Sequence, residues 1–114
     1  MTVGEAAALL GAGMLTEGDR EICGGLVCDV MSRAMAQGFS GMAWITRQAN
    51  MNALAVAVMT DAAFLIFPAG YMPEEKVINK AREEKKALLY APQEAFEAAG
   101  ILYGAGLRGR KDDG

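Results

Sequence analysis

Histidine is absent from the 114 residues of this sequence, and cysteine occurs only twice. Without an imidazole, the chain has no histidine-activated serine or cysteine nucleophile, no histidine base and few of the usual zinc sites. Two cysteines are too few for a disulfide scaffold, which favours a reducing cytoplasm. The phosphate-binding patterns G-x-x-x-x-G-K-[ST] and G-x-G-x-x-G, the latter in its strand-to-helix setting, are also missing. The sequence therefore predicts no catalytic residues, no cofactor and no metal ion, and it does not support a kinase.

The net charge is small as well, since 11 basic and 14 acidic residues give 11 − 14 = −3. No basic face is implied, so we expect no nucleic-acid partner. The apolar stretch from Met51 to Gly70 is interrupted by Asn52, Asp61 and Pro68, which favours two buried elements over a membrane-spanning helix. The first residues carry no basic leader, so we expect no signal peptide and a cytoplasmic protein.

What is present is an alternation of short apolar strands and helices. Thr2 and Glu5 form a capping-box pattern at the start of a first helix. The repeated order of a strand followed by a helix predicts a three-layer α/β domain with a mainly parallel sheet flanked by helices. We expect one domain at 1–107 and a flexible tail at 108–114. The predicted strands are Ile22–Cys28, Gly41–Thr46, Phe64–Phe67 and Ala87–Tyr90, and the predicted helices are Thr2–Leu10, Val30–Gln37, Asn52–Met59, one that begins after Pro73, and Gln93–Leu102.

The segment Asp19–Asp29 is the most unusual part of the chain. Gly24 and Gly25 remove two side chains from a predicted strand, so the backbone there should bulge, bend or meet another group closely. The two cysteines are five positions apart and point to opposite faces of a regular strand, although a bulge would let them converge. Even then two thiolates are half of a usual metal-ligand set, which favours structural thiols. Asp19 and Arg20 are interpreted either as an ion-pair cluster with Asp29 or as part of a ligand site.

Polar residues follow three successive strands. Open α/β sheets bind ligands at the carboxyl ends of their strands, so these residues predict a shared pocket at that rim. The alternative interpretation is a set of helix caps and turns without a ligand. Capping also suits Asp29 and Ser32 at the start of a helix. The candidate ligand-binding residues are Asp29, Ser32, Thr46, Gln48, Asn50, Asn52 and Gly70.

Several short segments of the chain carry a family resemblance, namely Asp19–Gly25, Asp29–Ser32, Trp44–Gln48, Met51–Ala57, Tyr71–Glu75 and Phe96–Tyr103. In these segments the chain resembles the DRTGG domain family. The resemblance implies a fold like the N-terminal domain of HPr kinase/phosphorylase, without that enzyme's phosphate-binding loop. It also implies a stand-alone regulatory or dimer-forming domain, of a kind often found beside iron-only hydrogenase genes. Asp19, Arg20, Gly24 and Gly25 are the residues that match the family motif.

These observations predict a non-enzymatic regulatory or assembly module. We expect it to be a homodimer, to have a hydrogenase-related protein as a possible partner, and to bind a small anionic or nucleotide-like ligand at the strand rim. One alternative is a small enzyme that uses Asp29 or Asp61 with Gln48 and Asn52. Another is a metal or cluster chaperone, for which Cys23 and Cys28 are the only plausible ligands.

Overall fold

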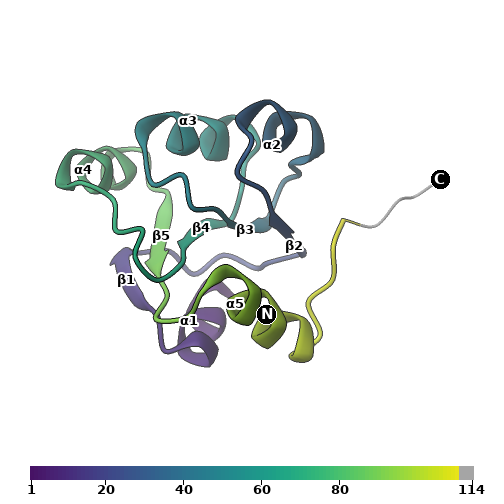
Figure 1. The fold of residues 1–114 in the computed structure, drawn as a ribbon. Helices are drawn as coiled ribbons and strands as arrows, with labels where there is room; N and C mark the ends of the chain where they lie inside the picture. The colour runs from purple at the N-terminus through teal and green to yellow at the C-terminus, as the bar shows by residue number, and fades with distance from the viewer. Residues whose placement is uncertain (111–114) are drawn as a thin grey trace.

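The computed structural model describes residues 1–110 and contains one five-stranded sheet with helices on both faces (Figure 1). The strand order is β1-β5-β4-β3-β2, in which β2 to β5 are parallel and β1 is antiparallel to β5. The predicted three-layer, mainly parallel fold is confirmed. The elements are α1 (Val3–Leu10), β1 (Gly13–Thr16), β2 (Gly24–Val27), α2 (Met31–Gln37), β3 (Met42–Ile45), α3 (Met51–Met59), β4 (Phe64–Phe67), α4 (Glu75–Glu83), β5 (Ala87–Tyr90) and α5 (Ala95–Gly104).

The sheet separates two hydrophobic cores, and side chains alternate between them along each strand. In β4, Phe64 and Ile66 pack beneath α1 and α5, whereas Leu65 and Phe67 pack beneath α2, α3 and α4. All four are fully buried, which explains why this strand is a continuous apolar run. Ile45 follows the same alternation and lies on the α1/α5 side.

The paired glycines lie in a regular strand. Gly24 and Gly25 pair with Met42 and Ala43 in unbroken register, so the bulge and the bend, two of the three predicted possibilities, do not occur. The strand is shorter than the predicted Ile22–Cys28. The third predicted possibility, close approach to another group, is confirmed. A Cβ on Gly24 would lie 3.0 Å from the carbonyl oxygen of Arg108 and 3.0 Å from the ring of Phe39.

The C-terminal segment begins in contact with this same strand. The amide of Gly25 donates to the carbonyl of Arg108 at 2.8 Å, and the Arg108 guanidinium lies 3.8 Å from the centre of the Tyr103 ring. The first residue of the predicted flexible tail is therefore held against the sheet edge, while 111–114 lie outside the described residues.

Helix starts follow the capping rules at α1, as predicted, and at α3, which begins one residue before the predicted Asn52. The Thr2–Glu5 capping box is formed at α1, and Asn50 caps α3 by accepting from the amide of Ala53 at 2.9 Å. The N-cap of α2 is Val30, with no side-chain hydrogen bond, so the prediction that Asp29 or Ser32 caps this helix is wrong. Within residues 1–110, no helix combines the length and apolar character that a bilayer crossing needs.

Candidate functional site

The carboxyl ends of the parallel strands carry one well-defined ion pair. Asp29 follows β2 and Arg47 follows β3, and strand alternation places both on the α5 side of the sheet. Asp29 Oδ2 accepts from Arg47 Nε at 2.6 Å, and Asp29 Oδ1 accepts from the Arg47 amide at 2.7 Å. The hydroxyl of the buried Thr46 also donates to Oδ1, at 3.1 Å.

This pair holds the Asp29 carboxylate in its ionised form. Burial raises the pKa of Asp29, but the hydrogen bonds from Arg47 and Thr46 outweigh burial, so the pKa lies below its usual value of 3.8. The Asp29 carboxylate in turn raises the pKa of Arg47, with a further contribution from the Tyr71 hydroxyl. A carboxylate that already accepts three hydrogen bonds is poorly placed to serve as a proton donor or acceptor.

A cavity of about 380 Å³ opens beside this pair. The loop after β4 supplies Pro68, Ala69 and Tyr71, and the start of α5 supplies Glu94, Ala95 and Phe96. Tyr71 is exposed, and Phe96 is 89% exposed, so two aromatic rings are open to a ligand. Glu94 and Phe96 were not predicted as site residues, although they lie at the start of the helix that follows β5, and the carboxyl end of a strand is the same signal that identified the other candidates.

The structure divides the predicted site residues between this cavity and the other side of the sheet. Asp29 lines the cavity. Gly70 lies in the lining loop after β4, where its amide donates to the Tyr90 hydroxyl at 3.0 Å. The others belong to the start of α2, to the β3–α3 connection and to the first turn of α3, and they do not line the cavity. Thr46 supports Asp29, Gln48 accepts from Asn50 at 3.2 Å, and Ser32 and Asn52 are exposed.

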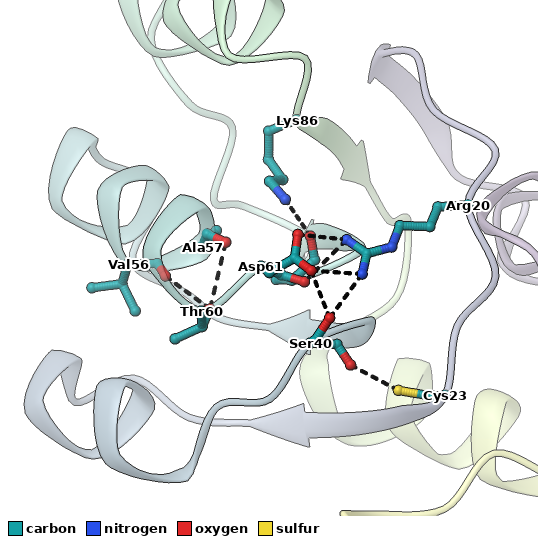
Figure 2. Close-up of polar contacts among 9 residues, drawn as sticks. Arg20, Cys23, Ser40, Val56, Ala57, Thr60, Asp61 and Lys86 are labelled. Atoms are coloured by element: carbon teal, nitrogen blue, oxygen red, sulfur yellow. Dashed lines mark hydrogen bonds and ion pairs between the residues drawn. The ribbon is translucent and has the colours of Figure 1, made fainter.

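Arg20 lies at the amino ends of the parallel strands, opposite the carboxyl rim, and it pairs there with Asp61 (Figure 2). The two guanidinium nitrogens Nη1 and Nη2 each bind one carboxylate oxygen at 2.8 Å. Ser40 completes the cluster by accepting from Arg20 at 2.9 Å and donating to Asp61 at 2.6 Å. The predicted cluster of Asp19 and Arg20 with Asp29 is therefore wrong. Asp19 instead accepts from the Gly4 amide in the first turn of α1, at 3.3 Å.

We name Arg20, Ser40, Asp61 and Lys86 the amino-edge cluster. It joins the connection before β2 to the loops that precede β3, β4 and β5. The hydrogen bond and charge of Arg20, with a hydrogen bond from Ser40, hold the pKa of Asp61 well below its usual range. Lys86 is buried and donates to the carbonyl of Ala62, and this burial lowers its pKa. Each of these contacts ties a loop to its neighbour, which indicates a structural role.

The two cysteines lie at opposite ends of β2. The thiol of Cys23 donates to the Ser40 carbonyl at the amino edge, whereas that of Cys28 donates to the Val30 carbonyl beyond the carboxyl end. Within residues 1–110, no group of three or more potential ligand side chains is placed to hold a metal ion. The convergence of these thiols through a bulge, required for the chaperone alternative, does not occur. Asp61 precedes β4, whereas Gln48 and Asn52 follow β3 and so lie at the other ends of the strands. The form of the predicted catalytic set that uses Asp61 therefore does not converge.

The lowered pKa of Asp29 predicts a pH-dependent contribution to stability. Because the folded pKa lies below the unfolded value near 3.8, the ion pair stabilises the fold above that pH and loses its contribution as pH falls through the folded pKa. We expect Asp29→Asn to cost about 1 kcal/mol at pH 7 and progressively less below pH 4. Urea denaturation of both proteins from pH 2 to pH 7 measures this difference. A difference that is constant across that range would contradict the assignment.

The fold and the rim together define an α/β domain with a small cavity at the carboxyl ends of its parallel strands. No family model and no curated protein sequence matches the chain. A similar solved structure is that of the CBS and DRTGG domains of the regulatory region of a Clostridium perfringens pyrophosphatase, complexed with the activator diadenosine tetraphosphate. The TM-score is 0.72 at 15% sequence identity, over 98% of this chain and 51% of that one. This chain thus spans about half of that structure, and the likeness shows a shared fold.

Proposed function

We propose that this chain is a non-enzymatic regulatory module that binds a small nucleotide-like anion at the carboxyl rim. The observation that carries the proposal is the cavity that Arg47 lines together with the exposed side chains of Tyr71 and Phe96. The similarity to a regulatory region crystallised with a nucleotide activator supports the same class of function. The volume of about 380 Å³ suits a ligand of mononucleotide size.

The charges of the cavity narrow the ligand class. Asp29 binds the guanidinium through Nε, and among the described residues the terminal nitrogens donate no hydrogen bond to a carboxylate. Those nitrogens suit a bidentate contact with one phosphate group. Glu94 is a second acid in the lining, and it disfavours a large negative charge. The aromatic rings provide stacking surfaces for a base. A nucleoside monophosphate therefore fits the cavity better than a polyphosphate.

Calorimetric titration with adenosine, AMP and ATP tests this proposal. We expect AMP to bind more tightly than adenosine, and Arg47→Ala to weaken AMP binding by about tenfold or more, because one charge-assisted contact to phosphate is worth roughly 1.5–3 kcal/mol. Arg82→Ala is the matched control, since Arg82 is an exposed arginine on α4 that bonds to Asn79 in the same helix. No heat with any of the three compounds, or equal loss in both variants, would contradict the proposal.

We further propose that the module acts through protein contacts, as a homodimer and with a hydrogenase-related partner. The partner rests on the sequence resemblance, and the homodimer is also supported by the apolar side chains that several helices expose. Size-exclusion chromatography of a mixture with purified iron-only hydrogenase tests the partner. Separate elution at micromolar concentrations would contradict it.

A further inference from the structure

A second cavity lies between α5 and the β2–β3 pair, with a volume of about 150 Å³. We name it the inner cavity, and its apolar lining includes Val27, Ile45, Ala99, Leu102 and Leu107. Side-chain alternation places Val27 and Ile45 on the face of the sheet that α5 covers (Figure 1). Asp29 and Arg47 line the cavity described above, which we name the rim cavity, on the same face. The two cavities therefore lie on one side of the sheet.

Each of the three elements that form the inner cavity also leads to the rim cavity. Val27, at the end of β2, lines both. Ile45, at the end of β3, lines the inner cavity, and Arg47, two residues later, lines the rim cavity. On α5, Ala95 lines the rim cavity and Ala99, one turn later, lines the inner one. Two residues of a strand span about 6.6 Å and one helical turn about 5.4 Å, so the cavities are neighbours along one groove.

The surface that the two cavities share is apolar and accessible. Val27 pairs in register with Ile45, which is buried, yet the Val27 side chain is 54% exposed. An apolar side chain on the inner face of a strand is normally covered by the helix that packs there. Since α5 leaves Val27 open, a ligand in the rim cavity has an apolar path towards the inner cavity.

The segment that follows α5 bounds the far end of the inner cavity. The amide of Gly25 donates to the carbonyl of Arg108 at 2.8 Å, and Leu107 lines the cavity. Arg108 is the only charged residue among the described residues of the lining. Its guanidinium donates to the carbonyl of Tyr103 at 2.8 Å and lies over the Tyr103 ring. These contacts hold the segment against β2, so the inner cavity suits a short, uncharged group.

We propose that the ligand of the rim is a nucleoside 5′-phosphate whose phosphate carries a short aliphatic group, and that this group occupies the inner cavity. The inference rests on the proposed function and defines its ligand more closely. With about 30 Å³ for a group of the size of a water molecule, 150 Å³ holds roughly five such groups. A phosphate bound to Arg47 would place its substituent one strand repeat from Ile45, at the entrance of the inner cavity.

The charges of the rim cavity favour such an ester over a free monophosphate. Arg47 is the only basic residue among the described residues of the lining, whereas Asp29 and Glu94 are both acidic. A free phosphate monoester carries a charge of about −1.5 to −2 at pH 7. An ester with a second alcohol carries a single negative charge and keeps two phosphate oxygens for the guanidinium. It therefore meets less repulsion from the two carboxylates.

Calorimetric titration of the wild-type chain with the methyl and the butyl ester of AMP tests the inference. The two esters have the same charge and differ by three methylene groups, so the comparison isolates the aliphatic group. We expect the butyl ester to bind about tenfold or more tightly than the methyl ester, because the additional methylene groups leave water in the inner cavity.

Ala99→Leu supplies an independent test, because Ala99 is half-buried in the wall of the inner cavity and leucine would fill that space. The butyl ester should then bind no more tightly than the methyl ester, and affinity for the methyl ester should stay at the wild-type value. Ala36→Leu is the matched control, since Ala36 is an exposed alanine on α2, over the other face of the sheet. It should retain the full gain from the butyl group.

Two results would overturn this inference and leave the rim site standing. One is a wild-type chain that binds the methyl ester as tightly as the butyl ester. The other is a gain from the butyl group that Ala99→Leu retains or that Ala36→Leu loses equally. If neither AMP nor either ester binds, the inference and the proposed function both fail.

Discussion

Replacing Trp44 with alanine is expected to lower the free energy of unfolding by about 3–5 kcal/mol. Trp44 lies in β3 and is completely buried in the core beneath α2, α3 and α4. Its loss removes the largest side chain of that core and leaves a cavity that a domain of this size cannot fill by relaxation. Since small domains have a total stability of roughly 5–15 kcal/mol, the variant should be close to unfolding at 37 °C.

Trp44→Phe measures how much of this loss of stability comes from the indole hydrogen bond, because phenylalanine keeps a large aromatic ring in the core. The indole Nε1 donates to the carbonyl of Cys28 at 2.9 Å, and phenylalanine would leave that carbonyl without this donor, at a cost of about 1–3 kcal/mol. Cys28 directly precedes Asp29, so the same substitution should weaken AMP binding at the rim as well as stability. Phe96→Ala is the control for stability, because Phe96 is exposed on α5 and its truncation should change the free energy of unfolding by less than about 0.5 kcal/mol.

Urea denaturation followed by circular dichroism measures all three variants, since it does not depend on the tryptophan signal. A Trp44→Phe protein with wild-type stability would show that the indole hydrogen bond contributes nothing. A Phe96→Ala protein as unstable as Trp44→Ala would show that Phe96 is covered in solution. That outcome would also remove this ring from the candidate ligand cavity.

The layers of the fold could be predicted because local patterns determine them. Phe64–Phe67 is apolar at every position because the two cores lie on either side of that strand. Thr2 and Asn50 mark helix starts because their oxygens satisfy the first free amides. The role of Gly24 and Gly25 could not be predicted uniquely, because a bulge and a close approach both favour glycine at these positions. Only the position of Phe39 and Arg108 decides between the two.

The candidate site could be predicted only in part, for a geometric reason. The rule that open α/β sheets bind ligands at the carboxyl ends of their strands identifies which end of the strands carries the site, but not which face of the sheet. Asp29 and Arg47 lie on the α5 side, whereas Asn50 begins α3 on the other side. Ser32 and Asn52 belong to helices of that second layer as well. The alternation of side chains along β2 and β3 predicts which residues share a face, since it assigns Asp29 and Arg47 to the same side of the sheet.

The partner of Arg20 could not be predicted from local sequence. Asp29 is nine residues from Arg20 and Asp61 is 41 residues away, so proximity along the chain favoured the wrong acid. The two ends of β2 are separated by the length of the strand, and Arg20 precedes β2 while Asp29 follows it. In a parallel sheet, residues before one strand meet residues before the next. Asp61 precedes β4 and Ser40 precedes β3, which is why these residues meet Arg20.

Substitution of Asp61 tests this amino-edge cluster, and we expect Asp61→Ala to lower the free energy of unfolding by about 2 kcal/mol. Two effects add. The ion pair with Arg20 is partly exposed, with side chains 41% and 59% accessible, so solvent screening limits its value to about 1 kcal/mol. Asp61 also has φ 59, and alanine tolerates this left-handed conformation less well than aspartate, at a further cost of roughly 1 kcal/mol.

Asp61→Asn distinguishes the two effects because asparagine keeps the tolerance for the left-handed region but loses the charge. It should cost about 1 kcal/mol, half the effect of alanine. Lys85→Ala is the backbone control, since Lys85 has φ 55 and lacks a salt bridge among the described residues, and it should be nearly neutral. A double-mutant cycle with Arg20→Gln then isolates the pair. Asparagine and alanine variants of equal stability would show that backbone conformation contributes nothing, and a coupling energy near zero would show that the ion pair does not hold these loops together.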